Sequence, residues 1–258
     1  MSTNEPARYG ECLARIRPSA PVRPEVQFQR QRQSPDRLNN SPRRTYDLLR
    51  STLVTKGRSM LLVERELIES MSASRNTIRT VLQQLAREGL VTREPKNGTR
   101  AADSLLLPID ELAPLEAQIL ECRSLGCPPM VRDRLRLPDG WTVFMIESLV
   151  LQEGVPLGLA VGYVALGDEQ SSDVNVDEGD VILILERQLG IRIGCSSTTV
   201  GAIAADEQTA ELVGVEVGAP MIWLEDVIED EHGQPRALSQ LRLRGDRVAF
   251  TANARRSA

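Results

Sequence analysis

The chain has 258 residues and a formal net charge of −5 at pH 7, and 41% of its residues are hydrophobic, which is typical of a globular protein of one or two domains. It lacks an apolar run of the ~18 residues that a membrane span needs, and its N-terminus lacks the apolar core of a signal peptide, so a cytoplasmic protein is expected. A single histidine and four scattered cysteines argue against metal sites, disulfide frameworks and Ser-His-Asp triads. An aromatic content of 3% argues against a base-stacking platform for single-stranded nucleic acid.

The charge is unevenly distributed along the chain. Residues 1–40 contain seven arginines and four acidic residues, for a net charge of +3. Residues 41–103 contain twelve basic and seven acidic residues (+5), whereas residues 104–258 contain twelve basic and twenty-five acidic residues (−13). A basic N-terminal part joined to an acidic C-terminal part indicates a module that binds a polyanion, attached to a second unit. The alternative is chance clustering of charges on solvent-exposed faces.

Composition and periodicity divide the chain into five segments. Residues 1–40 are rich in Pro, Arg, Gln, Asn and Ser, which predicts a disordered basic arm. Residues 41–102 predict a compact helical unit with a short hairpin, and the prolines of residues 103–129 predict a linker. Residues 130–252 predict a mixed unit of helices and strands, and residues 253–258 a short tail.

The basic unit has the pattern of a winged helix-turn-helix. Apolar residues at helical spacing predict a first helix that begins at Pro42, a second helix over 64–69 and a third over 75–88. Ser74 is placed to cap the third helix. Polar and basic side chains in the exposed first turn of that helix are suited to base edges in the major groove. These residues are Arg75, Asn76, Thr77 and Arg79.

Strands predicted at 90–93 and 99–101 flank a turn and form the wing. Here the run ERELIESMSASRNTIRTVLQQLAREGLVTREPKNGTR resembles the DNA-binding domain of the GntR family of bacterial transcription regulators. The resemblance implies contacts with double-stranded DNA at Arg65, Ser74, Arg75, Thr77, Arg79, Lys96, Asn97 and Gly98. Asn76, in the same exposed turn, and Thr99, beside the wing turn, are expected to contact DNA as well. One position departs from the family, which usually has Leu-Pro-Ser before Glu-Arg-Glu. Val63 stands there and cannot cap the second helix, a loss of about 1 kcal/mol.

The acidic part of the chain contains an internal repeat, in which 133–157 matches 211–236. The matched positions are 78 or 79 residues apart: Gly140 and Gly218, Glu147 and Glu225, Gly154 and Gly233, and Pro156 and Pro235. Each copy predicts a helix end, a glycine turn, a strand, a Gly-x-Pro hairpin and a returning strand. A helix over 181–189 and a strand over 191–200 are predicted between the copies. Two copies predict one antiparallel sheet with helices packed against it.

This layout, with the passages LERQLGIRI and LRLRGDRVAF, resembles the UTRA effector-binding domain of HutC-like members of the GntR family. The resemblance implies an α+β chain in which a winged helix-turn-helix is joined to a chorismate-lyase-like antiparallel sheet with helices, and dimerisation through this domain. The lyase relationship raises an enzymatic alternative. Catalysis needs positioned acid, base or electrophilic groups, and no such set is found, so an enzyme is not expected.

The family resemblance also implies the positions of an effector pocket. Members that bind sugar phosphates use two Arg, two Glu, a Ser and two Tyr, and alignment places those seven positions at Ser148, Val150, Ala160, Asp180, Ile182, Ala237 and Leu243. None of the seven matches. The arginine pair that would hold a phosphate is missing, and Asp180 would repel one. We therefore expect no phosphosugar at this pocket, but a more apolar or neutral ligand, or none.

These observations predict a nucleoid-associated repressor that binds a pseudo-palindromic operator as a homodimer and responds to a small-molecule effector, with no cofactor and no metal. Cys122 and Cys127 lack the second pair of ligands that a zinc site needs. The alternative is a DNA-binding regulator whose C-terminal domain only dimerises or binds a protein. The acidic residues Asp226, Glu229, Asp230 and Glu231 are expected to form a solvent-exposed hairpin end.

Overall fold

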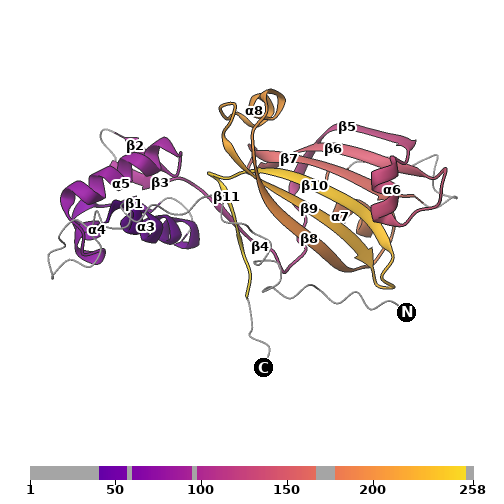
Figure 1. Cartoon of the computed structure of the whole chain (residues 1–258), viewed down its shortest axis with the longest axis horizontal. Helices are drawn as coiled ribbons and strands as arrows, with labels where there is room; N and C mark the ends of the chain where they lie inside the picture. Colours follow the sequence, from indigo (N-terminus) through magenta and orange to yellow (C-terminus); the bar gives the residue numbers. More distant parts are fainter. Residues whose placement is uncertain (1–40, 57–59, 95–97, 167–177, 254–258) are drawn as a thin grey trace, which may run out of the picture.

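The structure is a computed structural model, and it describes residues 41–56, 60–94, 98–166 and 178–253. An N-terminal unit of helices with a small sheet is joined to a larger C-terminal unit built on one twisted sheet (Figure 1). The predicted arm of residues 1–40 and residues 254–258 of the predicted tail lie outside the described residues. No described helix is long and apolar enough to cross a membrane.

Three helices pack around one core in the N-terminal unit: α3 (Pro42–Lys56), α4 (Glu64–Ser70) and α5 (Arg75–Arg87). They are joined by a sheet with the order β1-β3-β2, formed by β1 (Leu61–Leu62), β2 (Val91–Glu94) and β3 (Gly98–Ala101). Leu49 of α3 packs with Ile78, Leu82 and Leu85 of α5, and all four are fully buried because they recur at helical spacing on one face of each helix. The predicted winged helix-turn-helix is confirmed.

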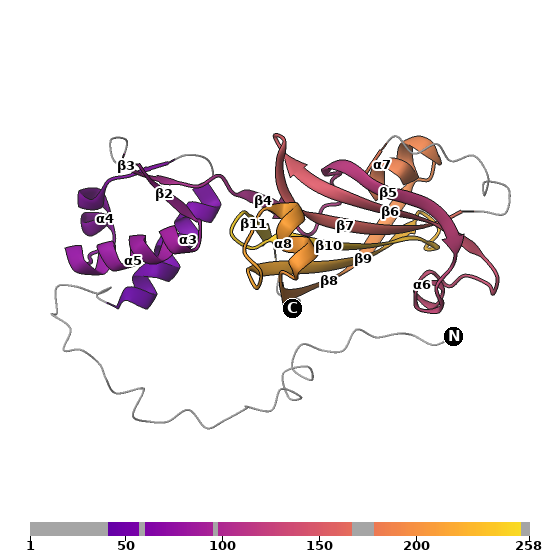
Figure 2. The same ribbon diagram turned by 90° about the horizontal axis from the view of Figure 1, so that it is seen from above.

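The C-terminal unit is built on a six-stranded antiparallel sheet with the strand order β5-β6-β7-β10-β9-β8 (Figure 2). Its strands are β5 (Glu116–Gly126), β6 (Thr142–Gln152), β7 (Val155–Ala165), β8 (Ile193–Ala204), β9 (Pro220–Asp230) and β10 (Pro235–Arg244). The α+β class predicted from the sequence is confirmed.

Different elements cover the two faces of this sheet. The helices α6 (Pro129–Leu135) and α8 (Glu207–Val213) bury apolar side chains against one face. The other face is covered by α7 (Val181–Leu183), which continues into one π-helical turn, η1 (Ile184–Gln188). A parallel pair of short strands, β4 (Leu105–Pro108) and β11 (Val248–Thr251), lies over the same face as α7. The sheet is therefore enclosed on both sides.

The internal repeat appears as two helix–strand–strand units, α6-β6-β7 and α8-β9-β10, whose last strands pair at the centre of the sheet. The match extends to the backbone. Both helices end on a left-handed residue, Arg136 with φ 53° and Gly214 with φ 68°. The hairpins turn at Gly154 and Gly233, with φ values of 77° and 74°, where the absence of a Cβ removes the steric cost.

Residues 103–129 differ from the predicted linker. They contain β4 and β5, and β5 forms a ladder along β6 as an edge strand of the main sheet. The prolines that suggested a linker instead lie where a missing N–H is tolerated, such as Pro108 at the end of β4 and Pro129 at the start of α6. The covalent connection between the two units is thus limited to the few residues between β3 and β4.

Candidate DNA-binding surface and ligand cavity

The start of α5 presents the polar residues expected of a DNA-reading helix. Ser74 caps the helix as predicted, because its Oγ accepts a hydrogen bond from the backbone N–H of Thr77 at 3.1 Å. Arg75, Asn76 and Arg79 are exposed. Thr77 is not, which corrects the expectation of an exposed side chain: it is 8% exposed, and its hydroxyl lies 2.8 Å from that of Ser74. Thr77 therefore supports the cap and is withheld from base edges.

An ion pair links the preceding helix α4 to this surface. Val63 provides no side-chain cap, as predicted, and Glu64 and Glu66 instead place negative charge at the positive end of the helix dipole. Glu64 also pairs with Arg79 of α5, with an Nε–Oε2 distance of 3.2 Å. Arg65 is exposed and pairs with Glu69 one turn on. The ion pair uses only the Nε of Arg79, so the other guanidinium N–H groups have no partner among the described residues.

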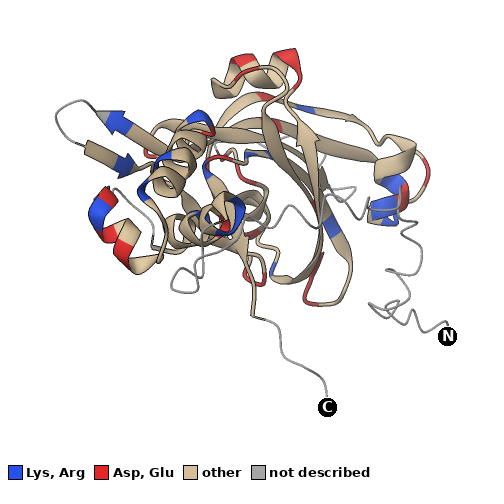
Figure 3. Cartoon of the chain, turned by 60° about the vertical axis from the view of Figure 1, so that its left-hand side comes forward, with Lys and Arg blue, Asp and Glu red and all other residues tan. Residues whose placement is uncertain are grey.

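The wing hairpin carries further basic residues. β2 and β3 pair from Val91↔Ala101 to Glu94↔Gly98, and Gly98 has a φ of 82° at the turn. In the described part of the N-terminal unit, basic positions occur on α3, α4 and α5 and on both wing strands (Figure 3). Thr99 is half-buried, while Lys96 and Asn97 lie outside the described residues.

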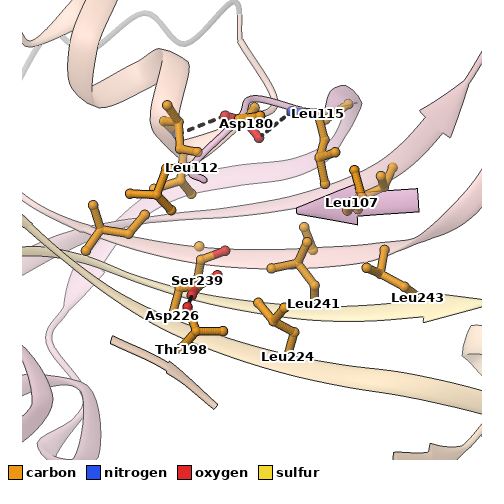
Figure 4. Close-up of a pocket in the computed structure, with 18 of the residues that line it drawn as sticks. Leu107, Leu112, Leu115, Asp180, Thr198, Leu224, Asp226, Ser239, Leu241 and Leu243 are labelled. Atoms are coloured by element: carbon orange, nitrogen blue, oxygen red, sulfur yellow. Dashed lines mark hydrogen bonds between the residues drawn. The ribbon is translucent and has the colours of Figure 1, made fainter. Parts of the chain in front are cut away.

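A cavity lies between the C-terminal sheet and the segments that cover it. Its floor is formed by β6, β7, β9 and β10, and its roof by α7 and by residues 107–115. Leucines supply much of the wall on both sides (Figure 4). They are Leu107, Leu112, Leu115, Leu224, Leu241 and Leu243.

Asp180 holds the roof of the cavity together. Its carboxylate accepts hydrogen bonds from the backbone N–H groups of Ile182 and Leu183, at 2.9 and 3.2 Å, and so caps α7. It also accepts from the N–H of Leu115 at 3.1 Å, which ties the roof segment to α7. Burial raises the pKa of Asp180 although these three bonds favour its charged form.

Asp226 lies on the floor, opposite Asp180 (Figure 4). Its cross-strand partners are Thr198 of β8 and Ser239 of β10, so three polar residues form a short row. The Thr198 hydroxyl donates a hydrogen bond to the Asp226 carboxylate. Burial raises the pKa of Asp226 by more than this bond lowers it, and the adjacent Glu225 carboxylate raises it further.

Five of the seven predicted pocket positions line this cavity: Val150, Ala160, Asp180, Ile182 and Leu243. The other two do not. Ser148 is buried beside the cavity, where its hydroxyl donates to the carbonyl of Gly179 at 2.7 Å. Ala237 is fully buried in the core beneath α7.

The sequence reasoning missed Asp226, Thr198, Ser239 and the roof segment 107–115. The sequence predicts Asp226 at a solvent-exposed acidic hairpin end, but it lies in the middle of β9 and faces the cavity. Asp230 is also buried, and it pairs with Arg236 at 2.7 Å. Of the four acidic residues, Glu231 is the one whose exposure matches the expectation, since Glu229 is half-buried.

Two family models match the chain. The model of the gntR family of bacterial regulatory proteins matches residues 44–100, and the UTRA domain model matches residues 114–249. The crystal structure of PhnF from Mycobacterium smegmatis superposes with a TM-score of 0.58 at 21% identity, covering 83% of this chain and 100% of that one, which shows a common fold.

Relatives by sequence are named as regulators of transcription. The HTH-type transcriptional regulator Rv0792c of Mycobacterium tuberculosis is 26% identical over 209 residues, which cover 73% of this chain and 75% of that protein. The HTH-type transcriptional repressor PhnF of Mycolicibacterium smegmatis is 24% identical over 199 residues, which cover 73% and 82%. The prediction that the chain is not an enzyme is confirmed by this relationship. The chain belongs to the GntR family, with a UTRA domain after its winged helix-turn-helix, and it is a DNA-binding transcriptional regulator.

Proposed function

We propose that this regulator represses transcription as a homodimer on a pseudo-palindromic operator, and that a small molecule in the C-terminal cavity modulates it. The observation that carries the proposal is the capped start of α5, where Arg75 and Arg79 are exposed for a major groove. Paired helix-turn-helix units read two half-sites about one helical turn or a multiple of it apart. In this proposal the wing, with Lys96, contacts the backbone or minor groove, and residues 1–40 add non-specific electrostatic affinity through their arginines.

The position of β4, between the cavity and the wing, supports modulation by a ligand. Leu107 of β4 and Phe250 of β11 are cross-strand partners, and both line the cavity. β4 begins only a few residues after β3 of the wing. A ligand that separates the roof from the floor therefore displaces β4, and β4 is directly continuous with the DNA-binding unit.

The DNA-binding part is tested by fluorescence anisotropy with DNA from upstream of the regulator's own gene. Arg75→Ala and Arg79→Ala are expected to weaken operator binding by about 1–3 kcal/mol each and to relax base preference, if each arginine is bidentate to a guanine. Arg87→Ala is the matched control, because Arg87 is an exposed arginine in the last turn of the same helix. Unchanged affinity in both Arg75→Ala and Arg79→Ala would show that α5 does not read the operator.

A second candidate function is regulation without an effector, in which the C-terminal domain only dimerises or contacts a protein. The observation that favours it is the small volume of the cavity, about 100 Å³. A thermal-shift screen of metabolites separates the two, since a ligand that binds only the folded state raises the melting temperature. A screen in which no compound raises it favours the second function.

A further inference from the structure

The side chains that line the cavity carry negative charge, whereas a site that binds anions carries positive charge. Its described lining includes three acidic residues, Glu111, Asp180 and Asp226, and no lysine, arginine or histidine. A neighbouring groove of about 460 Å³ shares Thr198, Ile182 and Leu112 with the cavity. That groove adds Asp110 and Glu186 and likewise has no basic residue in its described lining. The approach to the cavity is therefore negative as well, which attracts cations and repels anions.

Asp180 and Asp226 are both half-buried, and they differ in how many hydrogen bonds their carboxylates already accept. Asp180 already accepts three backbone hydrogen bonds. Asp226 accepts one, from Thr198, and no second donor and no cation pairs with it among the described residues. A carboxylate offers about four acceptor positions, so Asp226 retains most of its capacity. Removing a charge even partly from water is costly unless the charge is hydrogen-bonded or paired, and Asp226 accepts fewer hydrogen bonds than Asp180 from the described residues.

The surroundings of Asp226 are apolar. Leu224 and Ile228 precede and follow it on the same face of β9, and Leu241 lies beyond Ser239 on β10. A ligand that fills this space needs an apolar body as well as a donor group. Two hydroxyls, of Thr198 and Ser239, flank the carboxylate as further acceptors.

We propose that the cavity binds a small amine with an apolar body, whose ammonium group donates to the Asp226 carboxylate and to the flanking Ser239 and Thr198 hydroxyls. This inference rests on the proposed function in one respect, namely that the effector binds in this cavity. The leucine walls take the apolar body, and the negative groove guides the cation inward.

The test uses matched ligands that share an apolar body and differ in their polar group, which is cationic, neutral or anionic. Isoamylamine, isoamyl alcohol and isovalerate share one branched body, and benzylamine, benzyl alcohol and benzoate share an aromatic one. Melting temperature is measured on the full chain against the concentration of each compound. We expect at least one amine to raise the melting temperature at lower concentration than its alcohol, and the carboxylates to have no effect.

Asp226→Asn keeps the shape of the side chain and removes its charge. We expect it to weaken amine binding about 10- to 100-fold, since a hydrogen bond to a charged group contributes about 1.5–3 kcal/mol, and to leave alcohol binding unchanged. Asp133→Asn is the control, because Asp133 is an exposed acid on α6, across the sheet. The melting temperature of each ligand-free variant verifies that it folds.

Stronger binding of a carboxylate than of its amine, no effect of either amine, or unchanged amine binding in Asp226→Asn would overturn the proposal. Operator affinity, measured by anisotropy with and without the amine, separates it from the proposed function. If an amine binds through Asp226 but operator affinity stays the same, the ligand class is supported and the effector role fails.

Discussion

Asp246, in the turn between β10 and β11, lies against Gly89, the residue that follows the cap of α5. A Cβ at Gly89 would lie 3.1 Å from Oδ2 of Asp246. The Asp246 carboxylate is held in place by Arg244, whose Nε and Nη2 donate to its two oxygens at 3.1 and 2.8 Å. The C-terminal unit thus touches the DNA-reading helix at its far end, through a rigid bidentate pair.

Gly89→Ala is expected to reduce stability and to change the response of DNA binding to the ligand. Gly89 has a φ of 74°, so any side chain costs about 1–2 kcal/mol there, and the methyl group also presses on Asp246. Gly140→Ala is the control, since Gly140 has a φ of 82° but no atom within 4 Å of the added Cβ. Urea unfolding measures stability and anisotropy measures the response. Equal effects of the two variants on the response would contradict coupling through this contact.

Ser74→Ala is expected to lower the free energy of unfolding by about 1 kcal/mol, the usual value of a lost N-cap. Both the hydrogen bond to the Thr77 N–H and the contact with the Thr77 hydroxyl disappear. Ser70→Ala, at the exposed end of α4, removes the same hydroxyl from a position with no capping role and should change little. Chemical denaturation monitored by circular dichroism gives both values. The capping role is disproved if the two variants are equally stable.

Arg134→Ala is expected to destabilise the C-terminal unit by about 1–3 kcal/mol, because it leaves a buried carboxylate short of a partner. Arg134 of α6 pairs with Glu225 of β9 at 2.6 Å, and the Glu225 side chain is 8% exposed. Gln240 remains as its second donor at 2.9 Å. Arg136→Ala should cost less, because Arg136 pairs at 3.5 Å with the more exposed Glu229. Thermal unfolding of the two variants tests this order.

Asp226→Asn is expected to increase stability at neutral pH in the absence of ligand. Folding raises the pKa of Asp226 above its ordinary value of 3.8. At a pH between the ordinary pKa and the raised pKa of the folded state, Asp226 is therefore protonated more often in the native state than in the unfolded chain. Stability from this group therefore falls as pH rises through that window. The gain in unfolding free energy of Asp226→Asn should be largest at neutral pH and should vanish at a pH below the ordinary pKa of 3.8. Unfolding free energies measured from pH 3 to pH 8 verify the sign, and a less stable variant at pH 7 would refute it.

Features that follow from local spacing could be predicted from the sequence. The Ser74 cap and the apolar face of α5 depend on residues within two turns, and the repeat depends on glycines that recur at a fixed distance. Five of the cavity positions followed from the family resemblance, which places Val150, Ala160 and Leu243 on strands and Asp180 and Ile182 at the start of α7.

Features set by tertiary packing could not be predicted in the same way. Glu225 and Asp226 are adjacent acids, and nothing local indicates which one faces Arg134 and which faces the cavity. Thr77 is a polar residue in the first turn of α5, which suggests an exposed side chain, but it is buried and its hydroxyl contacts that of Ser74. Residues 103–129 have the proline content of a linker, but a proline at the end of a strand or helix cannot be distinguished in the sequence from a proline in a loop.

The two copies of the repeated hairpin use the same position differently. Ser148 and Asp226 are 78 residues apart, the offset of the repeat, and each pairs across its hairpin, with Ala160 and Ser239 respectively. In the first copy the Ser148 hydroxyl donates a hydrogen bond to the Gly179 carbonyl, whereas in the second copy the Asp226 carboxylate faces the cavity. The same position of the repeat therefore holds Gly179 in one copy and faces the cavity in the other. We expect mutations at Ser148 to affect folding and mutations at Asp226 to change which ligand the cavity prefers.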